Sequence, residues 1–416
     1  MRRYVIIGNG IAAVNCIEGI RSVDAKGRIT VVSEEKHSAY CRPLISYLLD
    51  GRTDQKRMQY RDPDFYDRMG CDMLYGRKAV RIDKEDKKVE LYDGTLLPYD
   101  ALCVAAGSHP FVPKFDGLDE VEKKFSFTTL DDALALEDAA DKGSRALIIG
   151  AGMIGLKCAE CLAERAAEVT VCDLADHVLP TFLDHECASY VQRRLEDHGI
   201  RFALGDSAAR FEKDTPSGAY KAVLKSGAIL AFDVLVLAIG ARANASLVKD
   251  IGGAGDRGIA VDEYMRTSVQ DIYAAGDCTE STDVSCGERK LLSNLPNAAM
   301  QGYAAGVNMA GGSAVFDKAI MMNSISFFGL HSMTAGSYTG ELFEEKTDTS
   351  VKRLYTENDL LKGFVLIGTS DRAGIYTSMI RNRTPLSSVD FEMMKKAATT
   401  AAFSAGAREK MFGGTV

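Results

Sequence analysis

The sequence predicts an α/β protein that contains two Rossmann-like dinucleotide-binding domains. A glycine-rich turn follows a buried strand at the start of the chain, and the same design returns at Arg145. In each copy the next strand ends in an acidic residue, which is the order of a dinucleotide-binding unit. From about residue 316 the chain has more Met and Phe in alternating patterns, which predicts a third, α+β domain.

The first turn follows an apolar run that begins at Tyr4 and reads as a buried parallel strand. Gly8, Gly10 and Ala13 then give a G-x-G-x-x-A pattern. The first glycine permits a tight turn, the second lets backbone approach a pyrophosphate, and the small third residue lets the helix pack on the strand. The helix N-terminus offers free N–H groups to the phosphates. The alternative is an ordinary glycine-rich turn of an α/β domain.

The second strand of this unit begins at Arg28 and ends at Glu34 and Glu35. A carboxylate at this point can accept hydrogen bonds from the adenosine ribose. We predict Glu34 for this role, because it directly follows Ser33. The alternative is an acidic strand end that faces solvent.

Two residues that follow are further candidates for the same site. Arg42 can pair with the pyrophosphate, since a guanidinium fork fits two oxygens, and Pro43 can fix the turn before a helix. The basic residues beyond them read either as a solvated face or as a docking rim for an acidic electron carrier: Arg52, Lys56, Arg57, Arg61 and Arg68.

Residues 77–107 read as antiparallel strands, with Asp93 and Gly94 at a hairpin turn. The segment closes on a buried strand and the small-residue turn Ala105-Ala106-Gly107-Ser108. Such a turn lets backbone approach a ligand closely. Pro110 and Pro113 mark a crossover to the next unit.

The repeat supplies the strongest internal signal. Gly150, Gly152 and Gly155 form a complete G-x-G-x-x-G, and the following strand ends at Asp173. One such pattern is weak, but two with their acids in one chain indicate two dinucleotides and electron transfer between them. Asp173 suits a free ribose 2′-hydroxyl, and residues 174–178 contain no Arg or Lys for a 2′-phosphate. NADH is therefore favoured over NADPH.

Later segments add further strands. A buried strand ends at Gly240, and another ends at Ala275-Gly276-Asp277, where a carboxylate follows a small-residue turn. In the C-terminal part we expect a hairpin at Asn358-Asp359, a helix over about 389–411 and a flexible Gly-Gly tail.

Composition limits the classes of function. The net charge is -8, from 50 basic and 58 acidic residues among 416, which argues against nucleic acid as a partner. No apolar run approaches the roughly 20 residues that a membrane span needs, and Arg2-Arg3 lead directly into the first strand without a signal peptide. We therefore expect a cytoplasmic protein.

The ten cysteines are scattered, as expected of buried thiols in a reducing compartment. Cys158 and Cys161 form a C-x-x-C inside the helix after the second glycine turn, where packing is the favoured interpretation over a redox or metal role. The six histidines show no ligand spacing, so no metal site is expected.

Together these motifs resemble the pyridine nucleotide–disulfide oxidoreductase superfamily, and the resemblance covers nearly the whole chain. It implies that the first fold binds FAD and that the second, inserted into it, binds the nicotinamide cofactor. The expected domains are an FAD-binding domain in two parts, an NAD-binding domain and a C-terminal α+β domain, with the residue ranges 1–112 and 236–315, 113–235, and 316–416, respectively.

The resemblance also implies residue roles. Asp277 corresponds to the carboxylate that holds the ribityl chain, and Asn297 and Gln301 resemble the helix start beneath the flavin pyrimidine end. The expected cofactor-binding residues are Gly8, Gly10, Ala13, Glu34, Arg42, Pro43, Val80, Ala106, Gly107, Gly276, Asp277, Asn297, Gly150, Gly152, Ile154, Gly155, Asp173 and Gly240.

Within the superfamily, the segment Tyr40-Cys41-Arg42-Pro43 resembles rubredoxin and ferredoxin reductases. The segments 322–329 and 363–376 resemble NADH:rubredoxin oxidoreductase and the flavin part of assimilatory nitrite reductase. This implies an NADH reductase that passes electrons through FAD to a small redox protein, rubredoxin or ferredoxin-like, or to an iron–sulfur partner subunit. The oligomeric state is not fixed by the sequence, and a homodimer is compatible with it.

Two residues depart from the ferredoxin-reductase pattern. Those relatives often have Lys at the position of Tyr47 and Glu at the position of Lys157, and the two meet near the flavin N5. In this chain the lysine occupies the second of these positions, as Lys157, and the first position holds the uncharged Tyr47. We expect Lys157 near the nicotinamide and the flavin, where it would stabilise a reduced anionic flavin. The alternative is a surface lysine on an ordinary helix.

Two other functions remain open from the sequence. Cys41 lies close to the redox cysteine of coenzyme A disulfide reductases and NADH oxidases, although one residue early and without the usual flanking Gly. The chain can also be an FAD-bearing subunit or redox sensor that binds both dinucleotides but turns over slowly.

Overall fold

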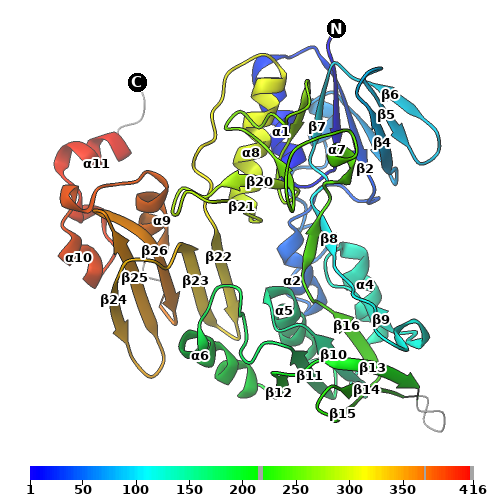
Figure 1. Cartoon of the computed structure of the whole chain (residues 1–416), viewed down its shortest axis with the longest axis vertical. Helices are drawn as coiled ribbons and strands as arrows, with labels where there is room; N and C mark the ends of the chain where they lie inside the picture. The colour runs from blue at the N-terminus through cyan, green and yellow to red at the C-terminus, as the bar shows by residue number, and fades with distance from the viewer. Residues whose placement is uncertain (214–218, 370–371, 413–416) are drawn as a thin grey trace.

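The computed structural model describes residues 1–213, 219–369 and 372–412. Its framework consists of two parallel sheets and one antiparallel sheet (Figure 1). The chain passes from the first parallel sheet to the second, returns to the first and ends in the antiparallel sheet. The predicted fold class is therefore correct.

The first parallel sheet has the strand order β19-β7-β1-β2-β3. Its strands in chain order are β1 (Arg3–Ile7), β2 (Arg28–Ser33), β3 (Cys71–Tyr75), β7 (Ala101–Val104) and β19 (Ile272–Ala274). In the register, Ile6 lies opposite Val31 on one side and Cys103 on the other. β19 pairs with β7 although the whole second parallel sheet lies between them in the sequence.

Two long helices pack together against this sheet, α1 (Ile11–Val23) and α8 (Leu295–Met309) (Figure 1). Small residues let their backbones approach closely. A Cβ added at Gly302 would lie 2.1 Å from the carbonyl oxygen of Ala12, and one at Gly306 would lie 2.1 Å from that of Cys16. The contact joins α8, late in the chain, to the first helix of the same unit.

Shorter elements in the same chain segments are η1 (Arg42–Leu44), α2 (Ile45–Leu49), α3 (Phe65–Arg68), β4 (Ala79–Asp83), β5 (Lys88–Leu91), β6 (Leu96–Pro98), β18 (Ile259–Ala260), β20 (Thr279–Thr282) and β21 (Arg289–Leu291). Strands β4, β5 and β6 form an antiparallel sheet, and Gly94 turns with φ +82° as the hairpin prediction requires. The prediction for 77–107 is wrong at its end, because β7 leaves this sheet and joins the parallel one.

The second parallel sheet has the order β12-β11-β10-β16-β9. Its strands are β9 (Lys124–Phe125), β10 (Arg145–Ile149), β11 (Glu168–Asp173), β12 (Ile200–Leu204) and β16 (Val234–Leu237). The accompanying elements are η2 (Leu118–Glu120), α4 (Leu130–Ala139), α5 (Met153–Leu162), α6 (His185–Glu196) and the antiparallel strands β13 (Ala208–Lys213), β14 (Tyr220–Leu224) and β15 (Ile229–Phe232).

The two units are joined by the antiparallel pair β8 (Ser108–Pro110) and β17 (Ala241–Ala243), followed by α7 (Ser246–Lys249). We keep the domain ranges of the sequence analysis as a proposal. The pairing of β8 with β17 supports the proposal that the chain passes between the two units near residues 110 and 240. The expected boundary at 235 falls within β16.

The C-terminal sheet is antiparallel, in the order β22-β23-β26-β25-β24. Its elements are β22 (Met322–Phe327), β23 (Leu330–Gly336), β24 (Glu341–Lys346), β25 (Val351–Glu357), β26 (Leu360–Ile367), α9 (Ala373–Arg381), η3 (Leu386–Ser388), α10 (Phe391–Lys396), η4 (Thr400–Ala402) and α11 (Ala405–Phe412). The hairpin predicted at Asn358-Asp359 is present, with φ values of +52° and +61°.

The single helix expected over about 389–411 is wrong, because the chain forms α10, η4 and α11 instead. Asp390 N–H donates to the carbonyl of Ala402 at 2.8 Å, and Val389 pairs with Phe403. The chain therefore folds back on itself and buries Phe403 in the C-terminal core. The expected Gly-Gly tail lies outside the described residues.

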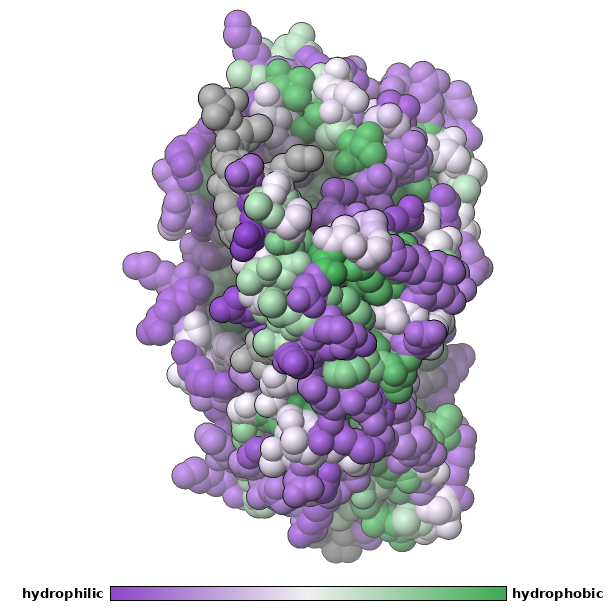
Figure 2. All heavy atoms as spheres, turned by 90° about the vertical axis from the view of Figure 1, so that its left-hand side faces the viewer, coloured by the Kyte–Doolittle hydropathy of each residue, from purple (hydrophilic) through white to green (hydrophobic). Residues whose placement is uncertain are grey.

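Figure 2 shows the face formed by the C-terminal unit, where hydrophilic residues surround smaller apolar areas. Exposed apolar side chains of this unit include Leu342 and Met393. Among residues 1–213, 219–369 and 372–412, no helix has the length and apolar character to cross a bilayer.

Candidate dinucleotide-binding sites

The first glycine turn lies between β1 and α1, at the carboxyl end of the first sheet. Gly8 has a φ of +111°, and a Cβ there would lie 2.1 Å from the carbonyl oxygen of Ala105. Gly10 is the N-cap of α1, no side chain caps this helix end, and a Cβ at Gly10 would meet nothing within 4 Å. Free helix N–H groups therefore face open space, which is the arrangement that binds phosphate. Ala13 is fully buried, as its packing role requires.

Asp277 follows β19 and Gly276 at the same edge of the sheet. Gly276 N–H donates to Gln301 Oε1 at 2.8 Å, so the buried Gln301 of α8 fixes the turn. The half-buried carboxylate of Asp277 has no hydrogen bond to any residue of the described ranges. Burial raises the pKa of Asp277, and the charge of Arg42 opposes this shift. A carboxylate without a partner beside a phosphate-binding turn fits the hydroxyl groups of a dinucleotide.

Arg42 and Pro43 lie in η1, with Pro43 in its first turn. The guanidinium of Arg42 donates to Glu35 at 2.5 Å and to the carbonyl of Thr128 at 2.6 Å, and Tyr40 donates to the same carboxylate at 2.7 Å. Burial lowers the pKa of the Arg42 guanidinium, but the charges of Tyr40, Glu35 and the nearby Asp277 outweigh it and raise the pKa overall. The sequence analysis did not find this use of Glu35, because it chose the neighbouring Glu34 as the functional acid.

Other expected residues of the first site lie in different settings. Glu34 is exposed and pairs with Lys78 at 2.9 Å. Val80 is exposed on β4. The carbonyl of Ala106 accepts from the side chain of Asn244 at 2.7 Å, and Gly107 turns with φ +64°.

Asn244 is a further residue that the sequence did not indicate. Its backbone N–H also donates to the carbonyl of Gly107 at 2.9 Å, and its Oδ1 lies 2.6 Å from Nδ1 of His109. It therefore joins the turn after β7 to the segment that returns from the second sheet. Asn297 is fully buried in α8 and donates to the carbonyls of Leu292 and Ile320.

The second glycine turn repeats the geometry between β10 and α5. A Cβ at Gly155 would lie 1.9 Å from the carbonyl oxygen of Gly150, whereas one at Gly152 would meet nothing within 4 Å. Ile154 is partly exposed in the first turn of α5, and Gly240 follows β16 with open space around its Cα.

Asp173 ends β11 and reaches the second glycine turn. One carboxylate oxygen accepts from the N–H of Ala151 at 2.6 Å and the other from the N–H of Ala175 at 2.8 Å. The two bonds hold the carboxylate at the point where the sequence analysis expects the adenosine ribose of NADH.

Lys157 lies on α5 and is largely buried. Its ammonium group pairs with Glu160 and donates to the carbonyl of Ser326 at 3.2 Å. It lies 5.3 Å from the ring centroid of Tyr47, so the two residues that depart from the ferredoxin-reductase pattern meet. The sequence analysis missed Glu160, although its i,i+3 spacing from Lys157 was a usable signal.

Cys41 is half-buried at the start of η1. Its N–H donates to Met58 at 2.8 Å, and burial raises the pKa of its thiol. Cys158 and Cys161 are buried on α5, and the thiol of Cys161 donates to the carbonyl of Ser46 at 3.0 Å. Burial also raises the pKa of Cys158. These contacts favour the packing interpretation of the C-x-x-C.

The basic residues after α2 form a paired surface. Carboxylates lie within ion-pair distance of four of the five: Arg52 with Asp50, Arg57 with Asp54, Arg61 with Glu18, and Arg68 with Asp62 and Asp64. This pairing favours the solvated-face interpretation over a free docking rim.

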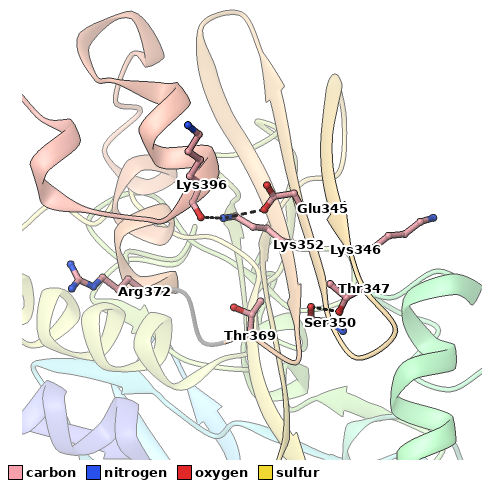
Figure 3. Close-up of a pocket in the computed structure, with 8 residues that line it drawn as sticks. All are labelled: Glu345, Lys346, Thr347, Ser350, Lys352, Thr369, Arg372 and Lys396. Atoms are coloured by element: carbon pink, nitrogen blue, oxygen red, sulfur yellow. Dashed lines mark hydrogen bonds and ion pairs between the residues drawn. The ribbon is translucent and has the colours of Figure 1, made fainter.

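A separate hollow of about 520 Å³ lies in the C-terminal unit, between the β24–β25 hairpin and α10 (Figure 3). Lys352 donates there to the carbonyl of Lys396 at 3.0 Å. The side chains of Lys346 and Lys396 point away from the hollow (Figure 3). None of the expected cofactor-binding residues lines it.

Comparisons with known proteins agree with this geometry. The family described as pyridine nucleotide-disulphide oxidoreductase matches residues 2–302. The epsilon subunit of NADH-dependent phenylglyoxylate dehydrogenase from Aromatoleum evansii is 31% identical over 395 residues, which cover 92% of each chain. The ferredoxin--NAD(+) reductase component of a 3-phenylpropionate/cinnamic acid dioxygenase from Photorhabdus laumondii is 30% identical over 74% of this chain and 77% of that protein.

Nitrite reductase [NAD(P)H] from Bacillus subtilis is 28% identical over 93% of this chain, which spans about half (48%) of that larger protein. Among solved structures, a putidaredoxin reductase in covalent complex with putidaredoxin aligns with a TM-score of 0.88 at 23% identity, over 96% of this chain and 99% of that one. The chain belongs to the pyridine nucleotide-disulphide oxidoreductase family and is an FAD-containing, NAD(P)H-dependent oxidoreductase.

Proposed function

We propose that this protein is an NADH:acceptor oxidoreductase that delivers electrons to an iron–sulfur partner subunit or to a small redox protein of the ferredoxin or rubredoxin type. The observation that carries the proposal is the pair of glycine turns, each beside its own carboxylate, Asp277 at the first and Asp173 at the second. One turn suits the resident FAD and the other suits NADH that binds and leaves.

The choice of FAD for the first site rests on its donors and acceptors. The N-terminus of α1 offers uncapped N–H groups to a diphosphate, and Arg42 lies nearby with a fixed guanidinium. Asp277 offers an acceptor for the hydroxyls of a polyol chain. When bound, FAD accepts a hydride and releases electrons one at a time.

The choice of NADH over NADPH rests on the second site. The carboxylate of Asp173 is already held by two backbone N–H groups. A 2′-phosphate there would lie beside this carboxylate, and residues 174–178 contain no Arg or Lys to balance it.

Several relatives support an iron–sulfur acceptor. The Photorhabdus laumondii relative is a ferredoxin--NAD(+) reductase component, and the Aromatoleum evansii relative is the epsilon subunit of a dehydrogenase. The raised pKa of Cys41 lowers its thiolate fraction, which speaks against a disulfide substrate.

Lys157 completes the proposed site as a positioning residue. Glu160 neutralises its charge and the ring of Tyr47 lies beside it. We propose that the ion pair of Lys157 and Glu160 fixes α5, the helix that follows the glycine turn proposed for NADH. Lys157 then does not act as a free cation.

The test is anaerobic reduction of the bound flavin by NADH and separately by NADPH, followed by reoxidation with ferredoxin, rubredoxin, oxygen or coenzyme A disulfide. We expect rapid bleaching by NADH and fast reoxidation by an iron–sulfur protein, in the wild type and in Cys41→Ser alike. Fast turnover with a disulfide that Cys41→Ser abolishes would establish the disulfide reductase instead. Slow bleaching of the flavin by NADH, with or without a partner protein, would establish an FAD-bearing subunit or redox sensor that turns over slowly.

A further inference from the structure

A cluster of two imidazoles and one carboxylate lies at the edge of the second sheet, outside the residues assigned so far. Asp176 and His177 lie in the loop after β11, and His185 begins α6. One ligand atom from each lies within 4.8 Å of the other two. The spacing in the sequence, one residue and then eight, matches no common metal motif, so the sequence analysis expected no site.

The two ring nitrogens of His177 each lie close to an oxygen atom. Its Nε2 lies 3.1 Å from the carbonyl oxygen of Leu183, and its Nδ1 lies 2.8 Å from Oδ1 of Asp176. Both neighbouring atoms are acceptors, but a neutral imidazole carries only one N–H. If Nε2 donates to Leu183, the lone pair of Nδ1 faces the side of Asp176, where both groups can bind one metal ion once they move apart from 2.8 Å.

His185 directs a second imidazole at the same carboxylate oxygen. Its Nε2 lies 3.2 Å from Oδ1 of Asp176, and the centroids of the two imidazole rings are 4.2 Å apart. Bonds of about 2.0–2.2 Å in a tetrahedral zinc site place neighbouring ligand atoms about 3.4 Å apart. Asp176 and His185 are both exposed, so they can open by this small distance without disturbing the core.

The contact of Nε2 with Leu183 is also what a metal-binding histidine needs. A ligating imidazole commonly donates its other N–H to a carbonyl, which fixes the tautomer and the ring orientation. His177 is the best buried of the three, with a side chain 17% exposed. His177 would therefore supply a fixed ligand, and the exposed side chains of Asp176 and His185 would move to bind the same ion.

Other charges near the start of α6 are balanced. Asp184 caps the helix by accepting from Cys187 N–H at 2.9 Å, and Asp184 and Glu186 both pair with Arg353 of β25. These acids offset the positive end of the helix dipole next to His185.

We propose that Asp176, His177 and His185 form a binding site for a divalent transition-metal ion such as Zn²⁺, with water in the fourth position. The ion would join the loop after Asp173 to the start of α6. The site therefore lies at the margin of the proposed NADH pocket, but its existence does not depend on the function proposed above.

The test is calorimetric titration of the chelator-treated holoprotein with ZnCl₂, in a Cys286→Ser background because Cys286 is an exposed thiol. We expect one saturable equivalent. Asp176→Asn and His185→Gln should weaken binding by at least about 10-fold without lowering the melting temperature in the absence of zinc. His331→Gln, which removes an exposed histidine elsewhere, should bind as the parent does.

Crystals grown with zinc should show an anomalous peak among the three side chains. Absence of saturable binding, or equal binding by His185→Gln, would overturn the proposal. In that case Asp176 and His177 form a hydrogen bond without a metal ion.

Discussion

Glu160 binds Lys157 through one carboxylate oxygen and the backbone N–H of Phe328, at 2.7 Å, through the other. Lys157 is on the same helix, α5, whereas Phe328 is in the turn between β22 and β23. A single buried carboxylate thus links the helix after the second glycine turn to the C-terminal sheet.

The substitution Glu160→Gln tests this link. Glutamine can still accept from Phe328, but Lys157 would lose its counter-charge in a largely buried position. We expect the free energy of unfolding to fall by about 2 kcal/mol, the range of a hydrogen bond to a charged group. Lys157→Met combined with Glu160→Gln should cost less than the sum of the single changes, because no uncompensated charge remains.

Urea unfolding of the wild type, Glu160→Gln, Lys157→Met and the double variant measures the coupling energy between Lys157 and Glu160. Glu137→Gln is the matched control, since Glu137 pairs with Arg165 in a more exposed setting and should cost less than about 1 kcal/mol. Equal losses in Glu160→Gln and Glu137→Gln would contradict a special role for Glu160.

Gly8 and Gly10 should respond differently to the same substitution. Gly8→Ala places a methyl group 2.1 Å from the carbonyl oxygen of Ala105 at a φ of +111°, so it should destabilise the fold by at least about 1–3 kcal/mol. Gly10 has a φ of -89° and open space around it. Gly10→Ala should therefore fold normally and lose flavin.

Thermal unfolding and the visible absorbance of the purified proteins separate the two effects. A Gly10→Ala protein that keeps its full flavin content would remove FAD from the first turn. A Gly8→Ala protein of unchanged stability would contradict the close approach of Gly8 to Ala105, in the turn after β7.

Asp277 should favour cofactor binding at the expense of apoprotein stability. Burial raises its pKa, which means that folding disfavours the charged carboxylate. For an acid whose pKa is higher in the folded than in the unfolded protein, the carboxyl group does not destabilise the fold at a pH below the unfolded pKa. The full loss of stability is reached once the pH exceeds the folded pKa. At neutral pH the apoprotein of Asp277→Asn should therefore melt at a higher temperature than the wild-type apoprotein.

The same variant should retain less flavin, because the amide offers a weaker acceptor than the carboxylate. The difference in melting temperature should shrink as the pH falls towards the pKa of Asp277. Full flavin retention in Asp277→Asn and Asp277→Ala would contradict the assignment of Asp277 to the FAD site.

The features that the sequence predicted correctly depend on neighbouring residues. Each glycine turn and the hairpin at Asn358-Asp359 are specified within a few positions, by glycine or by residues that tolerate positive φ. The prediction that a strand ends at Asp173 is correct for the same reason, because this strand follows its own glycine turn and helix and pairs with the strand before them.

The features that were missed depend on contacts between distant segments. Nothing local indicates that Phe328 donates to Glu160, or that Asn244 holds the turn after β7. The break between α10 and α11 has the same origin, because Phe403 is buried against the C-terminal sheet and not along a continuous helix. His177 and His185 meet only because the loop after β11 returns to the start of α6.

Asp173 should determine the choice of nicotinamide cofactor. Asp173→Ala removes the proposed acceptor for the ribose hydroxyl, together with the carboxylate proposed to disfavour a 2′-phosphate. We expect KM for NADH to rise about 10-fold to 100-fold, as for the loss of a hydrogen bond to a charged group, with kcat nearly unchanged. The ratio of kcat/KM for NADH to that for NADPH should fall.

The measurement is steady-state reduction of an artificial acceptor with each cofactor, on protein of unchanged flavin content. Asp206→Asn is the matched control. Asp206 lies just beyond β12, the strand next to β11, and its carboxylate accepts from the backbone of Ser207. It should leave both KM values as they are. If Asp173→Ala kept the wild-type preference for NADH, the second glycine turn would have to select its cofactor through other residues.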